Sequence, residues 1–417
     1  MKQYRALFQN RNFVLLWSGR IISSIGDWFN YVALIKILSA DPAHLGFMLA
    51  LVMVLKVLPD VLLAPLVGVL ADRLPRRWIM IASDITRAGL VLGLVFAQSP
   101  VTILVLVCLS ACMATFFNPA NSALLPSVVG PDHLVTANAL NTITGRTAQF
   151  LGNGLGAMTL LLIGAHNTFL IDSVSFLVSA ALTALVAVPA VAAAAPAATR
   201  PRGALAKFRA DLKEAVAYLR QQPTVKALIT MSAIVAVGDA ATNVLLITFV
   251  TVTLGLPAEW MGIAIGAVGA TGVLGGLAVG AIGNRVHWRH LLNWGLIYVW
   301  AVFVGGVSIQ RLLPSLGFFL LMGLGSGVLN VGFQSGIGLL VPNEVRGRIF
   351  GAWGMVQSAI YLICVPLSGF LSDRFGAVPV LLTFTITYLL GGVYGLFALR
   401  PEKQQEAAAA QPEPATD

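Results

Sequence analysis

The chain has 417 residues, of which 58% are hydrophobic and only 10% are charged, and its mean hydropathy is +0.86. Soluble domains usually contain about 45 to 50% apolar residues, so this composition excludes a soluble globular protein. The formal net charge of +9 does not indicate a nucleic-acid partner, because the basic residues gather at the ends of apolar segments. We therefore expect a polytopic membrane protein surrounded by lipid.

Twelve apolar segments are long enough to cross a bilayer, since a transmembrane helix needs about 20 such residues. Taken in chain order, they are 12–38, 43–70, 78–97, 101–123, 138–163, 168–189, 225–251, 258–282, 289–309, 314–340, 347–371 and 376–399. Most arginine and lysine residues fall in the connections on one side of this predicted membrane, whereas Arg311 and Arg374 fall clearly on the other. The positive-inside rule then predicts that both termini and the central loop are cytoplasmic.

An internal duplication relates the two halves of the chain. Gly26-Asp27 in the first span matches Gly238-Asp239 in the seventh. The same interval carries a second group of residues, Gly68, Asp72, Arg73 and Arg77, onto Gly280, Asn284, Arg285 and Arg289. The sequence therefore predicts an all-α membrane protein with twelve transmembrane helices in two pseudo-symmetric six-helix halves.

The composition changes abruptly between the sixth and seventh spans, where the two halves join. Apolar residues recur every three or four positions from Ala204 to Arg220, which predicts an amphipathic helix on the cytoplasmic membrane face. The expected divisions are an N-terminal half (1–190), a cytoplasmic linker (191–224), a C-terminal half (225–400) and a disordered cytoplasmic tail (401–417).

Residues 68–77 read Gly-Val-Leu-Ala-Asp-Arg-Leu-Pro-Arg-Arg and lie between the second and third spans. They resemble the signature loop of the major facilitator superfamily, Gly-x-Leu-x-Asp-Arg-x-Gly-Arg-Arg, although Pro75 replaces the second glycine and should stiffen the turn. The resemblance implies secondary active transport by alternating access. We assign the loop to a cytoplasmic gate formed by Gly68, Asp72, Arg73, Arg77, Asn284, Arg285 and Arg289. The alternative is that these charges only set the topology.

Four further stretches narrow this resemblance: Ser24–Trp28, Asn118–Ala120, Phe169–Asp172 and Val341–Arg348. They resemble the bacterial branch that contains macrolide efflux pumps and enterobactin-type siderophore exporters. The branch implies proton-coupled antiport, with efflux of hydrophobic or amphipathic drugs or siderophores, in the bacterial cytoplasmic (inner) membrane. A weaker resemblance to lysophospholipid transporters leaves a lipid translocator as the alternative. The expected partners are an amphipathic small molecule, protons and membrane lipids, and we expect a monomer because the duplication already supplies two halves.

Asp27 and Asp239 lie inside apolar spans, where a carboxylate costs about 2.5 to 3.5 kcal/mol by insertion scales. Such residues usually face a polar pathway, so both aspartates are candidates for proton coupling and substrate contact. The alternative is simple ion pairing. Arg20 lies two turns before Asp27 on the same helix face and is the candidate partner.

Other intramembrane charges occur in close pairs. Lys56 and Asp60 are four residues apart, which predicts a neutralised pair on one helix face; a translocation role is the alternative. Asp84 and Arg87 form a similar pair toward the cytoplasmic end of the third span, and Arg146 lies within the fifth. These charges would extend the cytoplasmic network.

In the superfamily that the signature loop resembles, the first, fourth, seventh and tenth spans line the pathway. This implies a cavity with aromatic and amide side chains, which suit a large amphipathic or partly cationic ligand. The candidate cavity residues are Trp28, Asn30, Phe116, Phe117, Asn118, Asn243, Asn330 and Gln334.

Neither an enzyme nor a cofactor is indicated. The sequence has no phosphate-binding Gly-x-x-x-x-Gly-Lys-Ser/Thr, no His-Glu-x-x-His and no Gly-x-Ser-x-Gly. Cys108, Cys112 and Cys364 lie inside predicted spans, where an unpaired cysteine behaves as a small hydrophobe. We therefore expect no metal site, and energy from an ion gradient.

Overall fold

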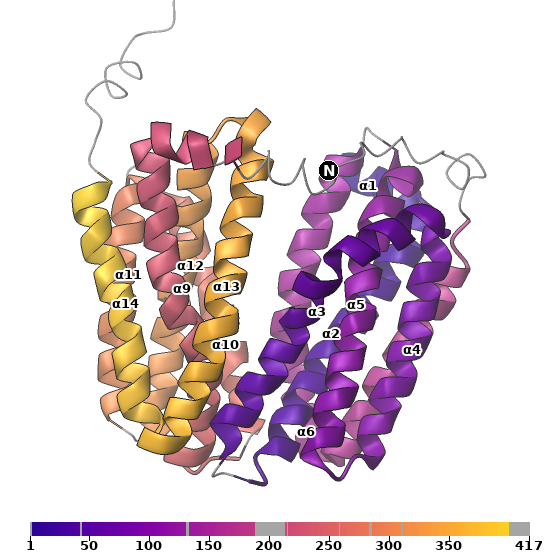
Figure 1. Cartoon of the computed structure of the whole chain (residues 1–417), viewed down its shortest axis with the longest axis horizontal. Helices are drawn as coiled ribbons and strands as arrows, with labels where there is room; N and C mark the ends of the chain where they lie inside the picture. Colours follow the sequence, from indigo (N-terminus) through magenta and orange to yellow (C-terminus); the bar gives the residue numbers. More distant parts are fainter. Residues whose placement is uncertain are drawn as a thin grey trace, which may run out of the picture.

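The structure, a computed structural model, describes residues 2–41, 44–130, 133–187, 213–214, 216–257, 259–282, 286–309 and 312–399. These residues form two groups of helices that stand side by side, with α1 to α6 in one bundle and α9 to α14 in the other (Figure 1). The predicted tail and most of the predicted linker lie outside the described residues.

The helix boundaries follow the predicted apolar segments to within a few residues. In the first bundle they are α1 (Lys2–Gln9), α2 (Arg11–Leu38), α3 (Leu45–Arg73), α4 (Arg76–Phe96), α5 (Pro100–Val129) and α6 (Leu134–Ala184). In the second they are α9 (Pro223–Thr248) with a π-helical turn (Phe249–Thr253), α10 (Glu259–Ile282), α11 (Trp288–Ser308), α12 (Leu312–Leu340), α13 (Asn343–Phe375) and α14 (Ala377–Ala398).

Among the described residues, eleven helices are long and apolar enough to cross a membrane. One of them, α6, breaks at Gly164, whose φ of 80° and ψ of 171° glycine adopts readily because it has no Cβ. The segments on either side of this break match two of the twelve predicted spans. At the same interval as the duplication, Gly376 has a φ of 84° and separates α13 from α14.

Local sequence signals set two of the helix starts. Asn10 caps α2, since its side-chain oxygen accepts hydrogen bonds from the N–H groups of Asn12 and Phe13 at 3.1 and 3.2 Å. Pro75 immediately precedes α4, and its carbonyl accepts from the N–H of Trp78 at 2.9 Å. Pro75 has a φ of −60° and an extended ψ of 119°, so the residue that departs from the signature loop lies at the cap of α4.

The two bundles are joined at the end opposite α1, here called the closed end. There the Asp373 carboxylate of α13 accepts hydrogen bonds from the N–H groups of Gly46 and Phe47, both at 2.9 Å, at the start of α3. Lys36 of α2 also pairs with Glu259 of α10, with 3.0 Å between Nζ and Oε1. Toward the other end, which contains the α3–α4 connection and is called the signature-loop end, the two groups of ribbons splay apart (Figure 1).

We predict that Asp373→Asn weakens the closed end. The substitution removes one charge-assisted acceptor for the N–H groups at the start of α3, a loss of about 1 to 2 kcal/mol. A change of this size shifts the ratio of joined to separated closed ends about 5- to 30-fold. Distances between spin labels on the α2–α3 and α13–α14 connections should show a larger separated population. The neighbouring Arg374→Gln is the control and should leave the distances unchanged; equal distributions in both variants would contradict the assignment.

Candidate functional site

A cavity of about 730 Å³ lies between the bundles and receives side chains from both. Its wall is mostly apolar and aromatic, with a few polar groups, which is the usual character of a small-molecule site. The charged residues of the lining are Asp27, Lys56, Arg87 and Asp239. The two aspartates of the duplicated Gly-Asp pair therefore face one common cavity.

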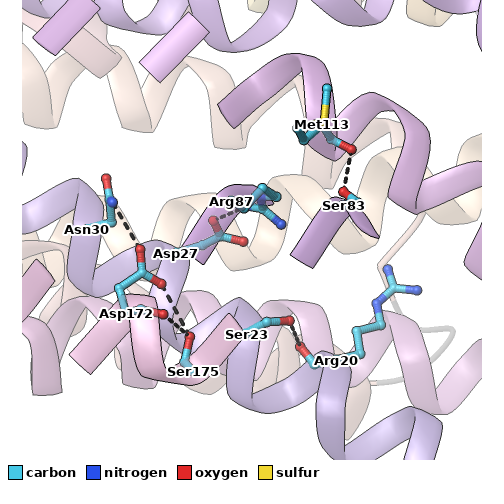
Figure 2. Close-up of polar contacts among 9 residues, drawn as sticks. All are labelled: Arg20, Ser23, Asp27, Asn30, Ser83, Arg87, Met113, Asp172 and Ser175. Carbon is cyan, nitrogen blue, oxygen red and sulfur yellow. Dashed lines mark hydrogen bonds and ion pairs between the residues drawn. The ribbon is translucent and has the colours of Figure 1, made fainter. Parts of the chain in front are cut away.

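Asp27 forms an ion pair with Arg87 of α4 at 2.5 Å (Figure 2). The Arg87 side chain is 9% exposed, whereas that of Asp27 is 45% exposed, so the carboxylate is the accessible member of the pair. The Arg87 guanidinium also lies 4.0 Å from the ring centroid of Phe176 in α6, a cation–π arrangement. Three helices thus hold one charge pair at the cavity wall.

The prediction that Arg20 pairs with Asp27 is wrong. Figure 2 shows the Arg20 side chain directed away from Asp27, while Arg87 occupies the partner position. Spacing along one helix identified Arg20, but α4 packs against α5 and α6, and its Arg87 side chain reaches Asp27 from there. Arg87 likewise pairs with Asp27 on another helix and not with Asp84, the partner that helical spacing predicted.

A further carboxylate, Asp172 of α6, lies behind this pair and is 0% exposed. It accepts hydrogen bonds from Asn30 at 2.9 Å and from Ser175 at 3.3 Å (Figure 2). A Cβ at Gly26 would overlap both the Asp172 carboxylate and the Ser175 hydroxyl. The glycine of the Gly-Asp pair therefore lets α2 approach α6 closely enough to bring Asp172 beside the ion pair.

Sequence reasoning did not include Asp172 among the candidate residues. The signal was present, because an acid in the middle of the sixth apolar span needs a partner for the same reason as Asp27.

Asp84 of α4 is also 0% exposed. Its carboxylate faces the Ser179 hydroxyl of α6, but neither carboxylate oxygen has a hydrogen-bond partner of normal geometry among the described residues. Buried polar groups normally have such partners, so Asp84 is an unsatisfied acid directly behind Arg87.

Lys56 and Asp60 do not form the predicted pair. The Asp60 carboxylate accepts from the Thr115 hydroxyl of α5 at 2.7 Å. The Lys56 ammonium lies 5.4 Å from the ring centroid of Tyr31 and within electrostatic range of Asp27. Lys56 and Asp60 do lie one turn apart on the same helix, but each side chain contacts a partner on a neighbouring helix.

In the second bundle, Asp239 of α9 accepts a hydrogen bond from the Tyr388 hydroxyl of α14 at 2.6 Å. The Tyr388 ring stacks on Phe303 of α11, with 5.6 Å between centroids and an interplanar angle of 10°. Both rings are nearly inaccessible. Asp239 is therefore held by a phenol, where Asp27 is held by a guanidinium.

Of the predicted cavity residues, Trp28, Asn30 and Asn243 belong to the lining. The others lie outside it: Phe116, Phe117, Asn118, Asn330 and Gln334. Phe117 packs instead in a separate apolar cluster near the signature-loop end. Asn118 is exposed one helical turn beyond the lining residue Ala114, so sequence reasoning placed this part of the cavity too far toward that end. Asn330 is exposed next to the lining residue Leu329, so it lies on a different face of α12.

The predicted gate is described only in part. Arg77 donates to the Ala184 carbonyl within its own bundle, and the Arg289 guanidinium lies 5.5 Å from the Trp288 ring centroid. Gly68 and Gly280 fall within α3 and α10. The remaining gate side chains, Asp72, Arg73, Asn284 and Arg285, and the side chain of Arg146 are outside the described part of the chain. The gate remains a prediction.

Comparison with known proteins identifies the family. A family model described as Major Facilitator Superfamily matches residues 16–360. The MFS-type transporter YfiS of Bacillus subtilis, itself uncharacterized, is 26% identical over 416 residues, covering 97% of this chain and 96% of that protein. Macrolide efflux protein A of Streptococcus pyogenes is 27% identical over 385 residues, covering 87% of this chain and 90% of the relative.

Solved structures share the fold at lower identity. A bacterial homologue of the iron transporter ferroportin in an inward-facing state has a TM-score of 0.69 and 17% identity, covering 94% of this chain and 98% of that one. The nucleoside transporter NupG has a TM-score of 0.69 and 12% identity, covering 93% and 100%.

We predict that Gly26→Ala destabilises the protein by about 1 to 3 kcal/mol, the usual cost of overpacking. The added methyl group would push α2 away from α6 at Asp172. Gly89→Ala in α4 is the matched control, because a Cβ there meets nothing within 4 Å; it should be neutral or slightly stabilising. Thermal unfolding in detergent compares the two, and equal unfolding temperatures would contradict the packing argument.

Proposed function

The chain belongs to the major facilitator superfamily, and we propose that it is a proton-coupled exporter of amphipathic small molecules. Membrane transport follows from the family, and the relatives include a macrolide efflux protein. The observation that carries the proton-coupling proposal is the Asp27–Arg87 ion pair at the wall of a cavity between the two bundles.

The charges around this pair do not balance. Three carboxylates, those of Asp27, Asp84 and Asp172, are within electrostatic range of the Arg87 guanidinium, and Lys56 supplies the second cation. A net charge is costly in a low-dielectric interior. The cluster is therefore neutral when one of its three carboxylates holds a proton, and this supports a proton-binding role.

Proton movement at this cluster has a direct structural consequence. Asp27 is the member that the cavity reaches, so it exchanges protons with the pathway. A proton on Asp27 removes the charge that holds Arg87, and the contact between α2 and α4 weakens. Since α2 also carries Lys36, which joins the second bundle at the closed end, the protonation state of the cluster biases the relative position of the two halves.

The arrangement of the bundles fits a cytoplasm-facing state. The basic connections favour a cytoplasmic location for the signature-loop end, and the polar contacts described above join the halves at the opposite end. Substrate then enters the cavity from the cytoplasm, and rocking of the two halves exposes it on the other side.

We predict that Asp27→Asn abolishes substrate-triggered proton release by the purified protein. The amide cannot exchange a proton, so the substrate-triggered pH signal should be lost. A panel of macrolides, dyes, catecholate siderophores and lysolipids would be added to protein in weakly buffered detergent while pH is recorded. Asp41→Asn, at the exposed Asp41–His44 pair, is the control and should behave as wild type.

Two outcomes would contradict this proposal. Full proton release in Asp27→Asn would remove Asp27 from the coupling step. Movement of lysolipid in proteoliposomes without any proton signal in the wild-type protein would replace the exporter with a lipid translocator.

A further inference from the structure

The duplicated halves differ in charge at the residues that surround the two cavity aspartates. The interval that carries Asp27 onto Asp239 also carries Ser175 onto Thr387 and Gly26 onto Gly238. A Cβ at Gly238 would lie 2.5 Å from the Thr387 hydroxyl, so the close helix approach is kept in both halves. The charged neighbours are not kept. Arg87, Lys56, Asp84 and Asp172 correspond to Val299, Val268, Leu296 and Phe384.

Asp239 is consequently a carboxylate in an apolar wall. Val299 and Val268 line the same cavity where the first half supplies Arg87 and Lys56. Within the described residues, Asp239 forms no ion pair with a basic side chain. Its carboxylate accepts a hydrogen bond from Tyr388, which orients the carboxylate but does not neutralise it. A carboxylate within a membrane-spanning helix is costly unless a partner compensates its charge.

We propose that Asp239 binds the positively charged group of the substrate, so that the transported molecules are amphipathic monocations. Tyr388 acts as a positioning residue, because its hydroxyl and its stacking on Phe303 fix the carboxylate. This inference rests on the proposed transport function and names its substrate class.

The rest of the cavity suits the apolar part of such a molecule. Partly exposed aromatic side chains from both bundles line it: Trp28, Tyr31 and Tyr361. Their faces attract a cation as well as an apolar body, and the volume of about 730 Å³ falls within the range of drug-sized sites. The basic residues of the lining, Lys56 and Arg87, lie by Asp27 in the other half. Asp27 is therefore already paired with a cation, whereas Asp239 has no cation beside it within the described residues and remains available to a cationic group.

Equilibrium binding tests this proposal without any ion gradient. The probe is radiolabelled tetraphenylphosphonium, a permanent monocation, and triphenylphosphine oxide is the neutral comparator. For Asp239→Asn we expect the affinity for the cation to fall on the order of 10- to 100-fold, the effect of losing a charged partner, with affinity for the neutral compound unchanged. Tyr388→Phe should lower the cation affinity by less, because the carboxylate remains but is no longer oriented. Unchanged neutral binding also shows that each variant is folded.

Other results would overturn the proposal. It fails if the wild-type protein does not bind tetraphenylphosphonium, if Asp239→Asn binds it as well as wild type, or if both compounds lose affinity equally. Because binding is measured at constant pH, the inference stands apart from proton coupling. If Asp239→Asn loses cation binding but the wild-type protein releases no protons, the binding proposal stands and only the proton-coupling proposal fails.

Discussion

The ion pair between Asp27 and Arg87 is the constraint on which the first bundle depends. A lone charge in the hydrocarbon region is costly, so a helix that carries Asp27 must pack where a cation can reach it. Arg87 on α4 meets that need at 2.5 Å. The absence of a side chain at Gly26 lets α6 come close enough to place Asp172 behind the pair. One polar cluster thus fixes the positions of α2, α4 and α6.

Duplication supplied the same backbone arrangement twice, and the two copies then diverged in charge. In the first half a guanidinium lies over the Phe176 ring and holds Asp27. In the second, the residue equivalent to Phe176 is Tyr388, and its hydroxyl holds Asp239 instead. A guanidinium neutralises a carboxylate, whereas a phenol only orients it. This difference underlies the division proposed here, with protons handled by one half and a cationic substrate by the other.

The sequence was sufficient for the spans, the repeat and the two cavity aspartates. Hydropathy, the constant spacing between repeated residues and the cost of a charge in an apolar span can all be recognised without knowing how the helices pack. Partners were harder to predict. Helical spacing suggested Arg20 for Asp27 and Lys56 for Asp60, yet the observed partners of the two acids are Arg87 and Thr115 on other helices. Side-chain contacts between helices depend on the distance and orientation of the packed helices, and a single sequence does not reveal either.

A double-mutant cycle on the ion pair tests the central claim most directly. The free energy of unfolding would be measured in detergent for wild type, Asp27→Asn, Arg87→Gln and the double variant. If the two charges compensate each other inside the membrane, each single variant leaves one of them unpaired. The double variant should then be more stable than the sum of the two losses predicts, by about 1 to 3 kcal/mol. Losses that simply add would contradict the account.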